Sequence, residues 1–145
     1  MTAGAGFLAA VLWFDLMHDV QVFRRPGDLP DEVLASISRY YRRVTTDARP
    51  MNRLVAAAML ATLAAIVVQI AAGDAPVWLA WTALVLAVLP IGLAAGRTVP
   101  RAVRLGRGAD TVEVRSGLAR SVFRDHLCCL GSIGLLLVLE VGFGR

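Results

Sequence analysis

Four long apolar stretches constrain this chain more than any other feature of its sequence. They cover residues 4–23, 51–72, 76–96 and 123–143. A helix of about 20 residues crosses the roughly 30 Å hydrocarbon core of a bilayer. The chain is 57% hydrophobic with a mean hydropathy of +0.65, which lies well outside the composition of soluble domains. We therefore predict an all-α, four-helix transmembrane bundle, with residues 1–145 forming one integral membrane domain.

The distribution of arginine predicts how the bundle is oriented. The chain has 15 basic residues, all of them arginine. Except for Arg145, they all lie between the first and second spans, between the third and fourth, or just inside the span that follows. Loops rich in arginine stay on the cytoplasmic side of a membrane. We therefore expect a multi-pass protein of the inner (plasma) membrane of a bacterium, with cytoplasmic arginine-rich loops and both termini outside.

The net charge of +4 does not indicate a nucleic-acid partner. No recognition motif or base-stacking pattern accompanies the arginines. At the cytoplasmic edge of a membrane they face anionic lipid headgroups, which attract each of them by about 1 kcal/mol. The partner we expect is the lipid bilayer.

Between the first two spans, the sequence predicts a further helix. Pro30 stands at a plausible first helical position, and Asp31 and Glu32 follow in the first turn. Apolar residues then recur at helical spacing as far as Val44. We expect a short cytoplasmic amphipathic helix that either lies on the membrane surface or caps the bundle. Residues 97–108, by contrast, are expected to form a basic connection, with a long helix resuming at Thr111.

The first span contains polar residues that need an explanation. Asp15, His18 and Asp19 are spaced i, i+3 and i+4, which places them on one side of a helix. A charged side chain in the centre of a bilayer costs roughly 2.5 to 3.5 kcal/mol on insertion scales. Such a residue therefore marks a functional site by default, and we expect this stripe to face the bundle interior.

The fourth span carries matching residues at a similar depth. Asp125 and His126 lie just inside its cytoplasmic end, within one or two turns of the depth of the acidic stripe. If the two helices are neighbours, both histidines and three aspartates meet in one pocket. Further polar residues expected at this level are Arg24 or Arg124 at the mouth, and Asn52 and Arg53 at the start of the second span.

Three chemistries are compatible with such a pocket, and the sequence does not choose between them. Two imidazoles could ligate a haem iron from both sides, or His18, His126 and Asp15 could bind a divalent metal. Alternatively, the carboxylates could load and unload protons in a dimeric proton-coupled transporter, with His18 as a relay. Finally, an aspartate and a histidine could act as general base and acid on a lipophilic substrate.

Two further interpretations involve no chemistry. The acids and histidines could pair with nearby arginines, Arg53 or Arg124 for Asp15, and simply fix the helix register. The protein could also be an accessory subunit of a larger membrane complex, since Ala57, Ala61 and Ala65 form a small-residue face of the kind that favours helix association in lipid. The adjacent Cys128 and Cys129 are expected to be reduced packing residues.

The size of the chain, its four spans, the histidine in the first span and the arginine-rich loops broadly resemble two small bacterial families. These are the haem-dependent four-helix protoporphyrinogen oxidases and the anthrone-oxygenase-like membrane proteins. No motif of either family carries functional residues onto this sequence.

Overall fold

The computed structural model describes residues 2–73 and 75–144, and all regular structure within them is helical. The first half of the chain forms α1 (Thr2–Asp19), a 3₁₀ turn (Val20–Val22), α2 (Asp31–Arg42), a π-helical turn (Arg43–Asp47) and α3 (Arg49–Ala72). The second half forms α4 (Val77–Leu93), a second π-helical turn (Ala94–Thr98), α5 (Val99–Arg107) and α6 (Val112–Phe143).

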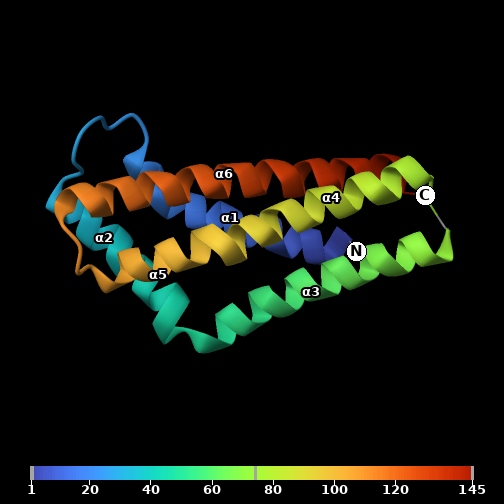
Figure 1. Ribbon diagram of the computed structural model, residues 1–145, viewed down its shortest axis with the longest axis horizontal. Helices are drawn as coiled ribbons and strands as arrows, with labels where there is room; N and C mark the ends of the chain where they lie inside the picture. Colours follow the sequence, from blue (N-terminus) through green and yellow to red (C-terminus); the bar gives the residue numbers. More distant parts are fainter. Residues whose placement is uncertain (1, 74, 145) are drawn as a thin grey trace.

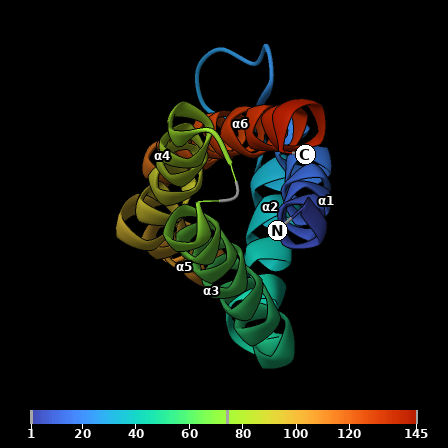
Figure 2. The same ribbon diagram turned by 90° about the vertical axis from the view of Figure 1, so that its right-hand side faces the viewer.

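The long helices form an antiparallel bundle, as the sequence predicts. Four helical stretches are long and apolar enough to cross a membrane: Thr2–Val22, Asn52–Ala72, Val77–Arg107 and Val112–Phe143. In Figure 1, α1 begins and α6 ends toward the same end of the bundle as the α3–α4 turn, and α2 and α5 lie at the other end. Helix α6 contacts both α1 and α4, while α3 contacts α1 and α4 and diverges from the bundle toward its own N-terminal end (Figures 1 and 2).

The interior of the bundle is divided into two apolar clusters. One joins α1, α3, α4 and α6 through Ala5, Ile66, Ala83, Ala87, Ile133 and Leu136. The small residues on α4 allow it to approach α6 closely, whereas Ala57 and Ala61 of α3 are exposed. The other cluster lies at the α2 end and joins α2, α5 and the first half of α6.

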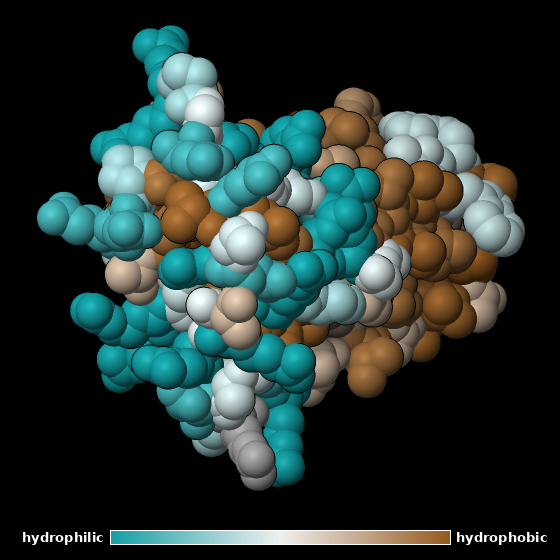
Figure 3. All heavy atoms as spheres, turned by 60° about the vertical axis from the view of Figure 1, so that its left-hand side comes forward, coloured by the Kyte–Doolittle hydropathy of each residue, from teal (hydrophilic) through white to brown (hydrophobic). Residues whose placement is uncertain are grey.

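Helix α2 caps the bundle, which decides between the two placements that the sequence leaves open. The centre of its apolar face is buried, with Leu34 and Ile37 at 0% exposed, and Val33 and Tyr40 are partly buried beside them. The loop before it is anchored to α6, because the Leu29 amide donates a hydrogen bond to Ser116 Oγ at 2.9 Å and the Arg120 guanidinium donates to the Gly27 carbonyl. Figure 3 shows that hydrophilic residues gather at this end of the molecule and that apolar residues cover most of the rest of the visible face.

The expected connection over residues 97–108 is wrong, because α4 continues through the π-helical turn into α5 and ends only at Arg107. One side of α5 is buried through Ala102, Leu105 and Gly106, so packing against α2 keeps this basic segment helical. Gly108, with φ 65°, then ends the helix in the left-handed conformation that glycine favours. Helix α6 follows from Thr111, as predicted.

Candidate functional site

The acidic stripe of α1 faces the interior of the protein, toward α2 and α6. Asp19 is 1% exposed and Asp15 is partly buried. His126, on α6, is 7% exposed and lies between the two carboxylates. The predicted meeting of the first and fourth spans at this depth is therefore present in the structure.

His126 and Asp19 form the centre of the site. The distance from His126 Nδ1 to Asp19 Oδ2 is 2.7 Å, and the Tyr41 hydroxyl donates to Asp19 Oδ1 at 2.5 Å. An ionised carboxylate only accepts hydrogen bonds, so Nδ1 of the imidazole must carry a proton. In the neutral ring Nε2 is then left as an acceptor, and it lies 3.9 Å from Asp15 Oδ2.

Asp15 has its own partner on α2. The Tyr40 hydroxyl donates to Asp15 Oδ1 at 2.6 Å. The ring of Tyr40 stacks on that of His18, with centroids 3.8 Å apart and planes 10° from parallel. His18 Nδ1 lies 3.1 Å from the Phe14 carbonyl. Two neighbouring tyrosines of α2 thus each bind one carboxylate of α1, and they fix both acids in the interior.

Both tyrosines are expected to stay protonated at high pH. Burial raises the pKa of Tyr40 far above its usual range, and the adjacent Asp15 carboxylate raises it further; burial and Asp19 raise the pKa of Tyr41 in the same way. In the unfolded chain both hydroxyls ionise near pH 10. Because the folded-state pKa is the higher one, the folded state loses stability as pH rises above about 10.

Absorbance at 295 nm tests this, since Tyr40 and Tyr41 are the chain's 2 tyrosines. We expect no phenolate signal near pH 10 while the protein remains folded, and a full signal once it is unfolded. Titration of either tyrosine near its ordinary pKa in the folded protein would contradict the buried tyrosine–carboxylate pairs.

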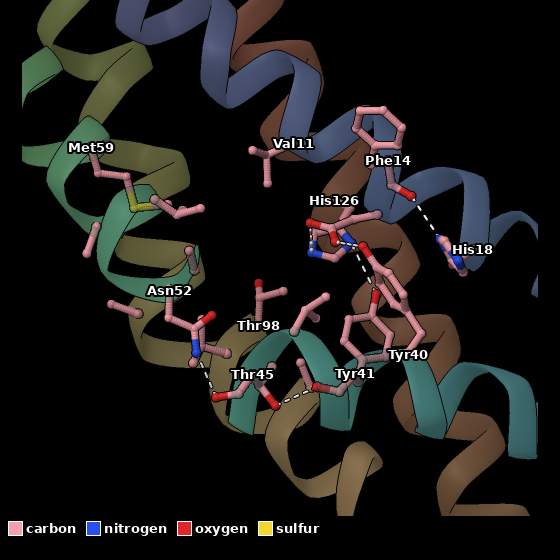
Figure 4. A pocket seen from close by; sticks show the side chains of 18 of the residues that line it. Val11, Phe14, His18, Tyr40, Tyr41, Thr45, Asn52, Met59, Thr98 and His126 are labelled. Carbon is pink, nitrogen blue, oxygen red and sulfur yellow. Dashed lines mark hydrogen bonds and ion pairs between the residues drawn. The ribbon is translucent and has the colours of Figure 1, made fainter. Parts of the chain in front are cut away.

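A large cavity opens beside these groups. Its volume is about 640 Å³, and α1, α2, α3, α4, α5 and α6 all contribute to its wall. Asp15, Tyr40, Tyr41 and His126 form a polar end, and most of the remaining wall is apolar, including Val11, Met59 and Ile91. Figure 4 shows Tyr40, Tyr41 and His126 together on one side, with Met59 across the space from them. A smaller cavity of about 130 Å³ borders on Asp15 and His126 as well and reaches Cys129 and Ile133.

Other residues expected in the pocket lie elsewhere or have different partners. Asp125 faces Arg97 and Arg101, so α6 presents its two neighbouring polar residues to different sides. Asn52 lines the cavity, and its amide donates to the Thr45 carbonyl at 2.7 Å. Arg24, Arg53 and Arg124 are exposed. Among the described residues, none of these three forms an ion pair with a carboxylate of the site.

The described residues give no support to the predicted metal site of His18, His126 and Asp15. Within residues 2–73 and 75–144, no group of three or more His, Cys, Asp or Glu side chains is arranged to hold a metal ion. The two imidazoles have separate partners, since His18 stacks on Tyr40 while His126 lies between Asp15 and Asp19. Cys128 and Cys129 are both free thiols; Cys129 is buried, as expected of a packing residue, whereas Cys128 is exposed, contrary to that expectation.

Sequence reasoning missed the partners of the carboxylates. Tyr40 and Tyr41 fall within the predicted amphipathic helix, for which no polar partner was predicted, and Arg97 and Arg101 fall within the predicted basic connection. Both tyrosines lie on the apolar side of an amphipathic helix, and this position indicates that their hydroxyls are buried. A buried hydroxyl needs a hydrogen-bond acceptor, so the sequence could have indicated a polar partner for each tyrosine.

Comparison with known proteins identifies no matching family model, and no curated protein or solved structure matches the chain. The fold and the site alone therefore define the class: an all-α bundle whose four apolar helices are compatible with a multi-pass membrane protein, with a buried pairing of histidine and aspartate.

Proposed function

We propose that this protein binds a lipophilic small molecule in the large cavity and exchanges a proton with its polar group through His126 and Asp15. The observation that carries the proposal is the composition of the wall: a mostly apolar cavity of about 640 Å³ with a few convergent polar groups at one end. Cavities of this size and lining are the usual form of small-molecule sites.

The polar end is organised for acid–base chemistry. The Nδ1–H group of His126 points to Asp19, and the Tyr41 hydroxyl holds Asp19 in place. Nε2 is therefore the ring nitrogen that is free to take a proton from a ligand. Asp15 stands 3.9 Å from that nitrogen and also lines the cavity, so it stabilises the imidazolium that would form. His126 is thus the proposed base, Asp15 its counter-ion, and Asp19 a positioning residue.

The ligand would enter from the bilayer. Asn52 and Ala56 of α3 line the cavity and are exposed, and α3 diverges from the bundle at this end (Figures 1 and 4). With the arginine-rich end on the cytoplasmic side, the cavity lies in the cytoplasmic part of the membrane. A lipophilic molecule with a hydroxyl or amine head would place its tail along the apolar wall and its head at His126.

Filling the cavity should abolish binding. Ala94 borders both cavities, and Ala94→Phe places an aromatic ring in this space. We expect at least a tenfold loss of affinity for 4-octylphenol, a probe with a hydroxyl head and an apolar tail, measured by native mass spectrometry. A tenfold loss corresponds to about 1.4 kcal/mol. His126→Gln should also weaken binding.

The matched control is Val85→Phe, an enlargement at an exposed position of α4, the helix that continues into the π-helical turn containing Ala94. This variant should bind the probe like the wild type. Equal binding of the probe by the wild type, Ala94→Phe and Val85→Phe would overturn the proposal. A Soret band in the absorbance spectrum of the purified protein would also contradict it, and would favour a haem site instead.

Proton-coupled transport by a dimer is a second candidate, and one observation favours it. Two carboxylates flank a single imidazole, and Asp15 lies at the cavity wall, where it can exchange a proton with a solute. In liposomes with an imposed pH gradient, Asp15→Asn should abolish solute movement. Unchanged transport by this variant would remove the second candidate.

A further inference from the structure

A second polar site lies where the π-helical turn Ala94–Thr98 meets α6, and it shares Thr98 with the wall of the cavity. Arg97 Nε is 3.2 Å from Asp125 Oδ2, and Arg101 Nη1 is 3.7 Å from the same oxygen. Both arginines also donate to Ser121 Oγ, Arg97 at 3.3 Å. Thr98 Oγ1 donates to Asp125 Oδ2 at 3.4 Å. The arrangement gathers two guanidinium groups around one buried carboxylate.

The charges at this site do not balance. Two arginines face one aspartate, which leaves one positive charge in excess. Asp125 is only 5% exposed at its side chain, whereas the side chains of Arg97 and Arg101 are 47% and 35% exposed. Each guanidinium carries five N–H donors. Asp125 and Ser121 do not use the donors on Nη1 of Arg97, nor those on Nε and Nη2 of Arg101. The site therefore presents fixed donors and a positive charge outward.

The depth of the site identifies the anion. Trp78 and Trp81 are exposed on the first turns of α4, where aromatic residues mark a membrane interface. Arg97 follows Trp78 by a rise of about 28 Å along the helix, close to the thickness of the hydrocarbon core. Arg97 and Arg101 thus stand at the level of the opposite headgroups, where the available anion is a lipid phosphate.

We propose that Arg97 and Arg101 bind the phosphate of an anionic membrane lipid, with Asp125 and Ser121 holding the two guanidinium groups in place. Arginine forks match phosphate oxygens in geometry, and such charge-assisted hydrogen bonds are stronger than neutral ones. The π-helical turn supports this arrangement, because it places Thr98, which is buried, beside Asp125, with Thr98 Oγ1 3.3 Å from the carbonyl oxygen of Leu93 five residues earlier. Although Thr98 borders the cavity, Arg97, Arg101, Ser121 and Asp125 do not line it, so this proposal does not rest on the proposed cavity ligand.

Native mass spectrometry of protein released from a mixture of phosphatidylglycerol and phosphatidylcholine tests the proposal. The wild type should retain phosphatidylglycerol preferentially. In Arg97→Gln/Arg101→Gln the preference should fall at least tenfold. The matched control Arg39→Gln/Arg107→Gln removes the same charge from two exposed arginines at the same end of the molecule and should keep the preference.

Equal losses in both double variants would show diffuse attraction and overturn the proposal. Protection against thermal unfolding by inorganic phosphate but not by phosphatidylglycerol would assign the site to a soluble anion and also overturn it. If the double variant fails to fold, a photoreactive phosphatidylglycerol on the wild type provides the test. Its crosslinks should map to peptides containing residues 97–101 or 121–125, and crosslinks confined to other segments would contradict the site.

Discussion

Asp19→Ala is expected to destabilise the folded protein by roughly 3 kcal/mol, through the loss of an acceptor that two buried donors share. The change leaves the Tyr41 hydroxyl and His126 Nδ1 without their acceptor, and both side chains are buried with Tyr41 only 2% exposed. Buried donors without partners cost about 1–3 kcal/mol each. Unfolding by SDS in mixed micelles, followed by circular dichroism, measures the free-energy difference.

Asp19→Asn and Asp28→Ala complete this experiment. The amide of Asn keeps one acceptor oxygen, so Asp19→Asn should lose less stability than Asp19→Ala. Asp28 lies exposed in the loop before α2, and its replacement should change stability by about 0.5 kcal/mol or less. If Asp19→Ala is as stable as Asp28→Ala, Asp19 does not hold His126 and Tyr41 together.

Gly106→Ala is expected to destabilise the protein by about 1–3 kcal/mol through overpacking. A Cβ atom at this position would lie 2.7 Å from the backbone nitrogen of Arg42 and 3.0 Å from its Cα. Since backbone atoms of α2 cannot rotate away as a side chain can, α2 and α5 must separate. The same unfolding measurement tests this variant. Because Tyr40 and Tyr41 lie on α2, displacement of that helix should also weaken their hydrogen bonds to Asp15 and Asp19.

Gly117→Ala is the matched control, with the opposite sign. Gly117 is exposed within α6, and a Cβ there meets nothing within 4 Å. Alanine has a higher helix propensity than glycine by about 1 kcal/mol, so this variant should be slightly more stable than the wild type. Destabilisation of similar size in both variants would mean that the close contact between α2 and α5 is absent.

The bundle and the position of the acidic stripe could be predicted from the sequence because both follow from one-dimensional patterns. Hydropathy gives the spans, and residues four apart on a helix share a side. Which histidine joins the carboxylates could not be predicted in the same way. Successive residues turn by about 100°, so His18 points about 100° away from Asp19, toward Tyr40. The same rotation separates Asp125 from His126, and only His126 faces α1.

The tyrosine partners could not be predicted because they depend on where α2 packs. That position is set by contacts distant in sequence, such as the Leu29 amide bonded to Ser116 and Gly106 against Arg42. The helical path of residues 97–107 was missed for a related reason. Its arginines suggested a loop, whereas Ala102, Leu105 and Gly106 are buried against α2 only in the folded protein.

Solid-state NMR in lipid bilayers measures the pairing of His126 with Asp19 directly. In the His18→Gln variant His126 is the single remaining histidine of the chain. With ¹⁵N-labelled histidine and ¹³C-labelled aspartate, we predict a dipolar correlation between imidazole Nδ1 and the Asp19 carboxylate carbon, which disappears in Asp19→Ala. An imidazole that correlates with lipid acyl chains and with no aspartate carboxylate would contradict the account.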